Sequence, residues 1–183
     1  MSNILLTTML CGLLPIVPAM ADDDIDNSTV AIKQFERFLG KWYEIARFDH
    51  KFERGQESTT AYYTKNDDGT LVVENSGWKN GKRKYAIGKA KTTNTAGLLR
   101  VSFFGPFYSD YRVMMLAPDY SYALIGSSSD KYLWILSRTP TITNAVKEKI
   151  LKEAEERGYN TERLIWVDQS RNINGKAKDK SAS

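Results

Sequence analysis

The sequence predicts an all-β protein: an eight-stranded antiparallel up-and-down β-barrel with one C-terminal α-helix packed outside and a short final strand. Three observations support this prediction. Most of the chain repeats one pattern, in which a run rich in Tyr, Val, Thr and Phe is followed by a short turn. A helical pattern occurs once, near the C-terminus. A chain of 183 residues with 42% hydrophobic content suits one core and is too short for two comfortable domains.

The first 21 residues carry no charged side chain and are followed at once by three aspartates. We expect residues 1–21 to be an export signal peptide, because Ala19-Met20-Ala21 is a small-x-small cleavage site. The apolar stretch from Ile4 to Val17 is too short to span a bilayer. Residues 22–34 are expected to form a flexible leader. Cys11 is the only cysteine, so a chain cleaved after Ala21 forms no disulfide.

The stretch from Gly40 to Phe48 is the strand around which the rest of the chain is organised. Its Trp, Tyr, Ile and Phe residues favour a pleated, partly buried surface. Phe35 and Phe38 precede it and are placed to plug one end of a barrel. A later strand, "YLWILSR", ends in Arg138 before a proline. We predict that this guanidinium stacks on the Trp42 ring, a contact worth roughly 0.5–2 kcal/mol.

The connection after the first strand, "DHKFERGQES", carries the only histidine of the chain. A solitary histidine in a charged loop is usually a surface residue, and no cysteine or second histidine stands near it to form a metal site. We therefore assign no chemical role to His50.

The remaining strands follow from Thr59 onward and are separated by turn signals. Asn66-Asp67-Asp68-Gly69 and Ala117-Pro118-Asp119 are two examples. Such short connections join neighbouring antiparallel strands, and eight strands that close on themselves form a barrel with room for one small ligand. A two-sheet sandwich is the structural alternative, but its crossovers need longer connections than these.

The helical pattern covers residues 143–158, with Thr143 as the expected N-cap and Gly158 as the C-terminal stop. Its apolar stripe consists of Val146, Ile150, Leu151 and Ala154. One such helix covers one outside face of the barrel. The segment "RLIWV" then supplies a short closing strand, and residues 170–183 are expected to be a basic disordered tail. Because no aromatic residue interleaves the lysines of this tail, we expect no nucleic-acid partner.

Three separated motifs resemble the lipocalin family, and in particular its bacterial outer-membrane members, which are close to apolipoprotein D. They are the Gly40-x-Trp42 opening, the strand "LRVSFFGPFYSDYRVMML" and the Arg138 that ends "YLWILSR". The resemblance covers residues 35–169, which we take as the lipocalin domain. The family's middle motif, usually Thr-Asp-Tyr, appears as Pro106-Phe107-Tyr108 or, out of register, as Ser109-Asp110-Tyr111. The register of that segment stays open.

The resemblance also bears on localisation, because many bacterial members are lipoproteins anchored through a cysteine after the signal. Here Leu10 stands before Cys11, where a small residue is wanted. We therefore favour soluble export to the periplasm, with anchoring at the outer membrane as the alternative.

The resemblance sets the strand register, and with it the residues expected to face the cavity. These ligand-binding candidates are Ala61, Tyr63, Val73, Asn75, Ala86, Val101, Phe103, Met114, Tyr132, Trp134 and Leu136. A solid core without a cavity is the alternative, but Ala61 and Ala86 are small where a filled barrel needs bulk. Arg112 has the parity of Met114 and either meets an anionic head group or lies on the surface. Placing Leu133 and Ile135 inward instead of Trp134 is the competing register.

The function that the resemblance implies is a carrier or scavenger of a fatty acid or lysophospholipid in the bacterial envelope. We expect no cofactor, metal or catalysis, because glycine-rich phosphate loops, metal-ligand clusters and a Gly-x-Ser-x-Gly elbow are absent from the sequence. Acid–base chemistry from Glu44 or Tyr132 on the same barrel is the enzymatic alternative. A homodimeric interaction module is a third reading.

Overall fold

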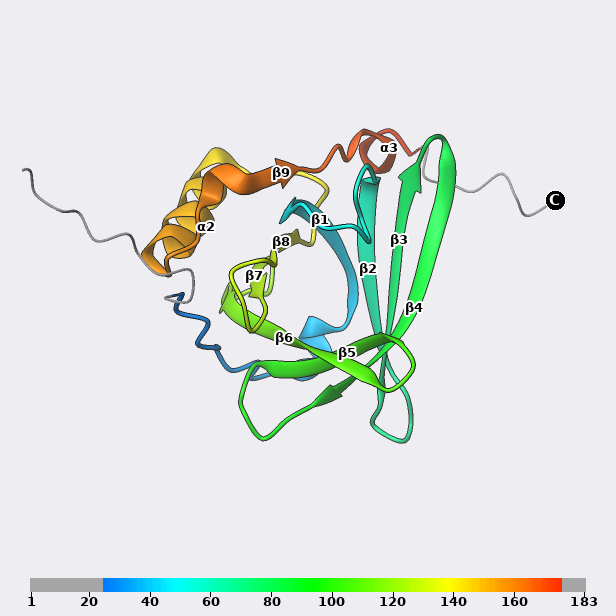
Figure 1. Ribbon diagram of the computed structural model, residues 1–183, viewed down its shortest axis with the longest axis vertical. Helices are drawn as coiled ribbons and strands as arrows, with labels where there is room; N and C mark the ends of the chain where they lie inside the picture. The colour runs from blue at the N-terminus through cyan, green and yellow to red at the C-terminus, as the bar shows by residue number, and fades with distance from the viewer. Residues whose placement is uncertain (1–24, 176–183) are drawn as a thin grey trace, which may run out of the picture.

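The computed structural model describes residues 25–175; the predicted signal peptide, Cys11 and residues 176–183 lie outside that range. A short helix, α1 (Phe35–Phe38), leads into the barrel. The eight barrel strands are β1 (Gly40–Phe48), β2 (Glu57–Lys65), β3 (Leu71–Lys79), β4 (Lys82–Thr92), β5 (Leu98–Phe104), β6 (Phe107–Leu116), β7 (Tyr122–Gly126) and β8 (Leu133–Ser137). They pair in chain order, and β1 pairs with both β8 and β2. The predicted closed meander is confirmed (Figure 1).

The predicted helix and closing strand are also present. Helix α2 (Asn144–Glu156) begins after Thr143, whose hydroxyl accepts a hydrogen bond from the Val146 amide at 3.3 Å, and the chain leaves it at Gly158 with a φ of 88°. The 3₁₀ turn η1 (Thr161–Arg163) then leads into β9 (Leu164–Trp166), which pairs with the end of β1. In Figure 1, α2 and β9 lie outside the ring of strands.

Two apolar clusters divide the molecule into an outer and an inner core. The outer core joins Ile150 and Ala154 of α2 to side chains of β1, β6, β7 and β8. The inner core takes buried side chains from every strand between β1 and β8, so it lies inside the barrel. Phe38 is fully buried in it, with its ring centroid 5.2 Å from that of Trp42 and 5.6 Å from that of Tyr63. Phe38 therefore plugs one end, as predicted.

The two flanking segments are held more tightly than the sequence predicts. Residues 25–34, expected as a flexible leader, lie against the barrel: the Val30 amide donates to the Val113 carbonyl at 2.8 Å. The tail predicted from residue 170 begins instead with helix α3 (Ser170–Ile173), and Arg171 Nε of this helix donates to Glu57 of β2 at 2.7 Å. None of the helices between residues 25 and 175 is long and apolar enough to cross a membrane.

Candidate ligand-binding site

Most of the predicted cavity residues meet in the inner core. Seven belong to that cluster or pack against it: Ala61, Tyr63, Val73, Val101, Phe103, Trp134 and Leu136. Leu133 and Ile135 lie in the outer core, beside α2. The competing register of β8 is therefore excluded, and Trp134 has the inward parity that we predicted.

Two further candidates extend the interior wall toward the other end of the barrel. Asn75 of β3 pairs with Ala86 of β4 and with Ala61 of β2. Ala86 precedes the buried Ala90 by four residues on a regularly paired strand, so it shares the inner face, although it is exposed. The side-chain oxygen of Asn75 is buried without a hydrogen-bond partner among residues 25–175.

The placement of Met114 on the interior wall is wrong. Met114 is fully buried in the outer core, and the Tyr159 hydroxyl lies 3.5 Å from its sulfur. Tyr111 and Val113 of strand β6 face inward, so Met114, the residue after Val113, faces outward. A register shift between Val113 and Met115 keeps Met115 on the outer side as well.

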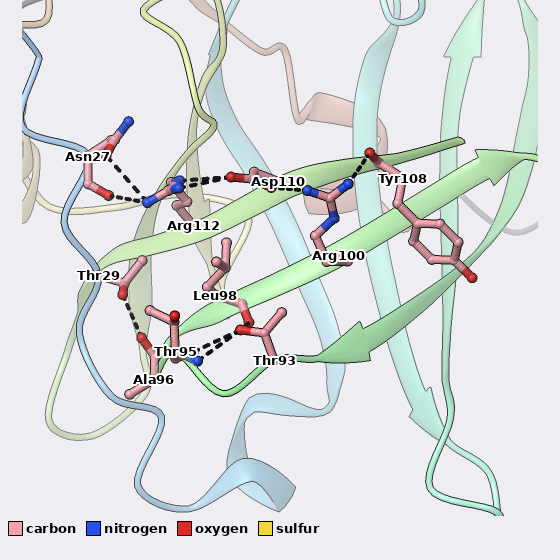
Figure 2. A network of polar contacts seen from close by, with 10 residues as sticks. All are labelled: Asn27, Thr29, Thr93, Thr95, Ala96, Leu98, Arg100, Tyr108, Asp110 and Arg112. Carbon is pink, nitrogen blue, oxygen red and sulfur yellow. Dashed lines mark hydrogen bonds and ion pairs between the residues drawn. The ribbon is translucent and has the colours of Figure 1, made fainter. Parts of the chain in front are cut away.

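Arg112 lies on the surface side of β6 and does not reach the interior. Its guanidinium donates to Asp110 at 2.9 Å and contacts the carbonyl oxygen of Asn27 at 3.4 Å, and Arg100 holds the other oxygen of Asp110 at 2.6 Å (Figure 2). Arg100 and Asp110 are also paired across the two strands. The pairing of β5 with β6 gives the register that the sequence left open: Ser109-Asp110-Tyr111 continues the ladder, with Tyr111 inward.

A hydrogen bond between two tyrosines crosses the interior. Tyr63 of β2 donates to the Tyr111 hydroxyl of β6 at 2.9 Å. Burial raises the pKa of Tyr63 well above its ordinary value, so both rings are neutral and present hydroxyl groups. The interior is thus lined by apolar side chains and crossed by one hydrogen bond between two hydroxyl groups.

At the end opposite α1, the interior carries a buried ion pair that sequence reasoning missed. Glu44 Oε1 lies 2.5 Å from Arg47 Nη1, and both side chains are almost fully buried. Strict alternation from Trp42 brings Glu44 inside but puts Arg47 outside. A register shift between Glu44 and Ala46 turns two successive residues, Ile45 and Ala46, toward the outer core, and Arg47 then faces inward.

The loop between β1 and β2, residues 49–56, covers this end of the barrel, and we call it the covering loop. Arg47 Nη2 holds its backbone by donating to the carbonyl oxygens of Glu53 at 2.8 Å and Gln56 at 3.1 Å. The Glu53 side chain points inward, with 9% of the residue exposed, and accepts a hydrogen bond from Trp134 Nε1 at 3.2 Å. An interior tryptophan is thereby tied to the loop.

His50 is also part of this arrangement, which corrects its assignment to the surface. Its side chain is only 9% exposed, and its Nε2 lies 2.8 Å from Glu53 Oε2. The ring packs edge-on against Trp134 at 5.4 Å, while Tyr132 stacks on Trp134 at 5.8 Å and 11°. The candidate Tyr132, just ahead of β8, therefore lies beside the covering loop.

The two buried carboxyl groups have opposite pKa shifts. Burial, and then the charge of Glu53, raise the pKa of Glu44 well above its ordinary value despite the nearby Arg47. Burial also acts to raise the pKa of Glu53, but the contact with His50 and the hydrogen bond from Trp134 outweigh it and leave the pKa lowered. The pKa of Glu44 is thus shifted toward the protonated form and the pKa of Glu53 toward the ionised form. Between residues 25 and 175 no group of three or more metal-ligating side chains gathers.

Comparison with known proteins agrees with this architecture. A family model described as a lipocalin-like domain matches residues 33–169. The outer membrane lipoprotein Blc of Escherichia coli K12 is 49% identical over 138 residues, which cover 73% of this chain and 78% of that protein. Temperature-induced lipocalin-1 of Arabidopsis thaliana is 40% identical over 146 residues, or 74% of this chain and 78% of the relative.

Solved structures resemble the fold at lower identity. The cockroach allergen Per a 4 superposes with a TM-score of 0.67 at 18% identity, covering 84% of this chain and 99% of the allergen. Lobster apocrustacyanin A1 gives a TM-score of 0.65 at 18% identity, with 81% and 88% coverage. These similarities concern the fold alone.

Proposed function

Because the chain belongs to the lipocalin family, we propose that it holds one amphipathic lipid, a fatty acid or a lysophospholipid, inside the barrel. The observation that carries this proposal is the composition of the interior. Apolar side chains line it from Phe38 onward, and polar side chains gather at the opposite end around Glu44 and Arg47. The apolar region suits an acyl chain, and the polar end suits a head group.

The energetics are sufficient for binding without catalysis. Burial of each methylene contributes about 0.8 kcal/mol, so the gross contribution of a long acyl chain is on the order of 10 kcal/mol before the cost of association. Micromolar or somewhat tighter affinity is expected.

The site of action that we propose is the bacterial cell envelope. Relatives from Escherichia coli and Vibrio cholerae are named outer membrane lipoproteins, and the first 21 residues here read as an export signal. Soluble periplasmic protein and outer-membrane anchoring through Cys11 are the two forms to be distinguished.

Calorimetric titration with a fatty acid and a lysophospholipid tests the binding role. Ala86 and Ile87 are neighbours on β4, but Ala86 has the inward parity while Ile87 is 68% exposed. Ala86→Trp should fill the interior and weaken binding of both lipids, whereas Ile87→Trp should leave affinity unchanged. Equal effects of the two variants, or no lipid binding by the parent protein, would contradict the proposal. Native mass spectrometry of protein purified from its own envelope would identify the lipid, and sizing chromatography would detect a dimer.

A further inference from the structure

The Glu53 carboxylate lies inside the barrel as a buried anion supplied by the protein's own covering loop. Trp134 Nε1 donates to it at 3.2 Å, and His50 Nε2 lies 2.8 Å from the same oxygen. Trp134 and His50 come from opposite ends of the chain's barrel region, yet both lie close to one carboxylate oxygen: Trp134 forms a hydrogen bond with it, and His50 contacts it without one. The interior therefore contains a formed site for a single anionic oxygen.

This site has donor capacity that Glu53 does not use. Arg47 Nε and both ring nitrogens of His50 are buried and have no hydrogen-bond partner within the described part of the chain, although His50 Nε2 lies 2.8 Å from Glu53 Oε2. Unpaired buried donors are costly, by about 1–3 kcal/mol each in folded proteins. A ligand with more than one acceptor oxygen would satisfy groups that the Glu53 side chain leaves unpaired.

The charges around the site favour an anion from outside. Arg47 is buried beside Glu44 at 2.5 Å, and burial raises the pKa of that carboxyl, which weakens its ability to balance the guanidinium charge. Glu53 is therefore the main source of negative charge facing Arg47, His50 and Trp134. If its side chain leaves, an uncompensated buried guanidinium remains.

We propose that the anionic head group of the bound lipid replaces the Glu53 carboxylate at Trp134 and His50. The inference rests on the proposed lipid-binding function and assigns it a head-group site. The group that binds is an anionic oxygen, which belongs to the carboxylate of a fatty acid or to the phosphate of a lysophospholipid. Arg47 holds the backbone of the covering loop through two carbonyl oxygens, so the exchange needs rotation of the Glu53 side chain into solvent rather than unfolding of the loop.

Glu53→Ala is the first test, because it removes the competing carboxylate and keeps the backbone carbonyl that Arg47 binds. Asp49→Ala is the matched control: it removes a carboxylate from the same loop, but that side chain is 41% exposed and paired with Arg54. Titrations use palmitate, a palmitoyl lysophosphatidate and the uncharged monopalmitoylglycerol. Relative to the parent protein, Glu53→Ala should bind the anionic ligands on the order of tenfold more tightly, because the site is no longer occupied internally. Affinity for the uncharged ligand should not change.

Trp134→Phe is the second test, and it keeps an aromatic ring while removing the N–H donor. It should weaken binding of the anionic ligands several-fold more than binding of the uncharged one. A gain with palmitate alone assigns the site to a carboxylate, and a gain with lysophosphatidate alone assigns it to a phosphate. Equal changes for charged and uncharged ligands in both variants would overturn the head-group site while leaving lipid binding intact. Failure of the parent protein to bind any of the three would instead overturn the proposed function.

Discussion

The guanidinium carbon of Arg138 lies 3.8 Å from the centroid of the Trp42 ring. The same guanidinium donates to the carbonyl oxygens of Lys41 at 2.6 Å and Leu39 at 2.9 Å, and Trp42 Nε1 donates to the Phe38 carbonyl at 2.8 Å. The contact predicted from the two ends of the barrel sequence is confirmed. It ties the end of β8 to the entry of β1 and covers the plugged end of the barrel.

The free energy of unfolding should depend on this contact. Arg138→Ala should lower it by roughly 1–3 kcal/mol, because the stack and several hydrogen bonds to backbone carbonyls are lost together. Urea unfolding of the variant measures the change. Arg54→Ala is the control, since Arg54 is 64% exposed and its ion pair with Asp49 is worth little. Unaltered stability combined with altered lipid preference would contradict a structural role.

Trp134 should contact the bound lipid and contribute to its affinity, because its ring lies on the inner face of the barrel. Lipid binding should change tryptophan fluorescence. Trp134→Ala should weaken lipid binding by about 1–3 kcal/mol, measured by calorimetry, and Trp134→Phe should cost less because most of the aromatic surface remains. If Trp134→Ala reduced stability or changed the oligomeric state but left lipid affinity intact, Trp134 would not be part of the lipid-binding surface.

The raised pKa of Glu44 predicts a pH dependence of stability. The folded chain keeps a proton on Glu44 that the unfolded chain releases once the pH exceeds about 4.3. Folding is therefore stabilised fully below that pH, and the contribution is lost as the pH rises toward the higher folded-state pKa. Across this range the parent protein should lose stability relative to Glu44→Gln, which cannot titrate.

Urea unfolding of both proteins at a series of pH values measures this difference, with Glu74→Gln on the exposed side of β3 as a control. The opposite trend, in which the parent gains stability relative to Glu44→Gln as the pH rises, would mean that Glu44 is ionised by its contact with Arg47.

The signal sequence makes a prediction about the mature chain. We expect cleavage after Ala21, so the intact mass of protein recovered from the envelope should match a chain that begins at Asp22. A mass that retains Cys11 with attached acyl chains would show the membrane-anchored form instead.

The sequence alone determined the barrel, its plugged end and its helix. These features depend on local patterns: strand runs between turn residues, a Thr143 cap and a stop at Gly158, and two separated motifs that bring Trp42 and Arg138 together. With the register taken from the lipocalin resemblance, side-chain alternation also placed Tyr63, Val73 and Trp134 on the inner face, because period two holds wherever a strand is regular.

Only the tertiary structure decided where that alternation fails and how the covering loop folds back. The register shift after Glu44 brings Arg47 inside. Strand β6 alternates regularly from Tyr111 to Met114, but only its tertiary contacts show that Tyr111 and Val113 face inward and Met114 outward. His50 is buried because Glu53 and Trp134, which lie 81 positions apart, meet over the interior. A bulge and a loop contact depend on partners distant in the chain, so no local pattern encodes them.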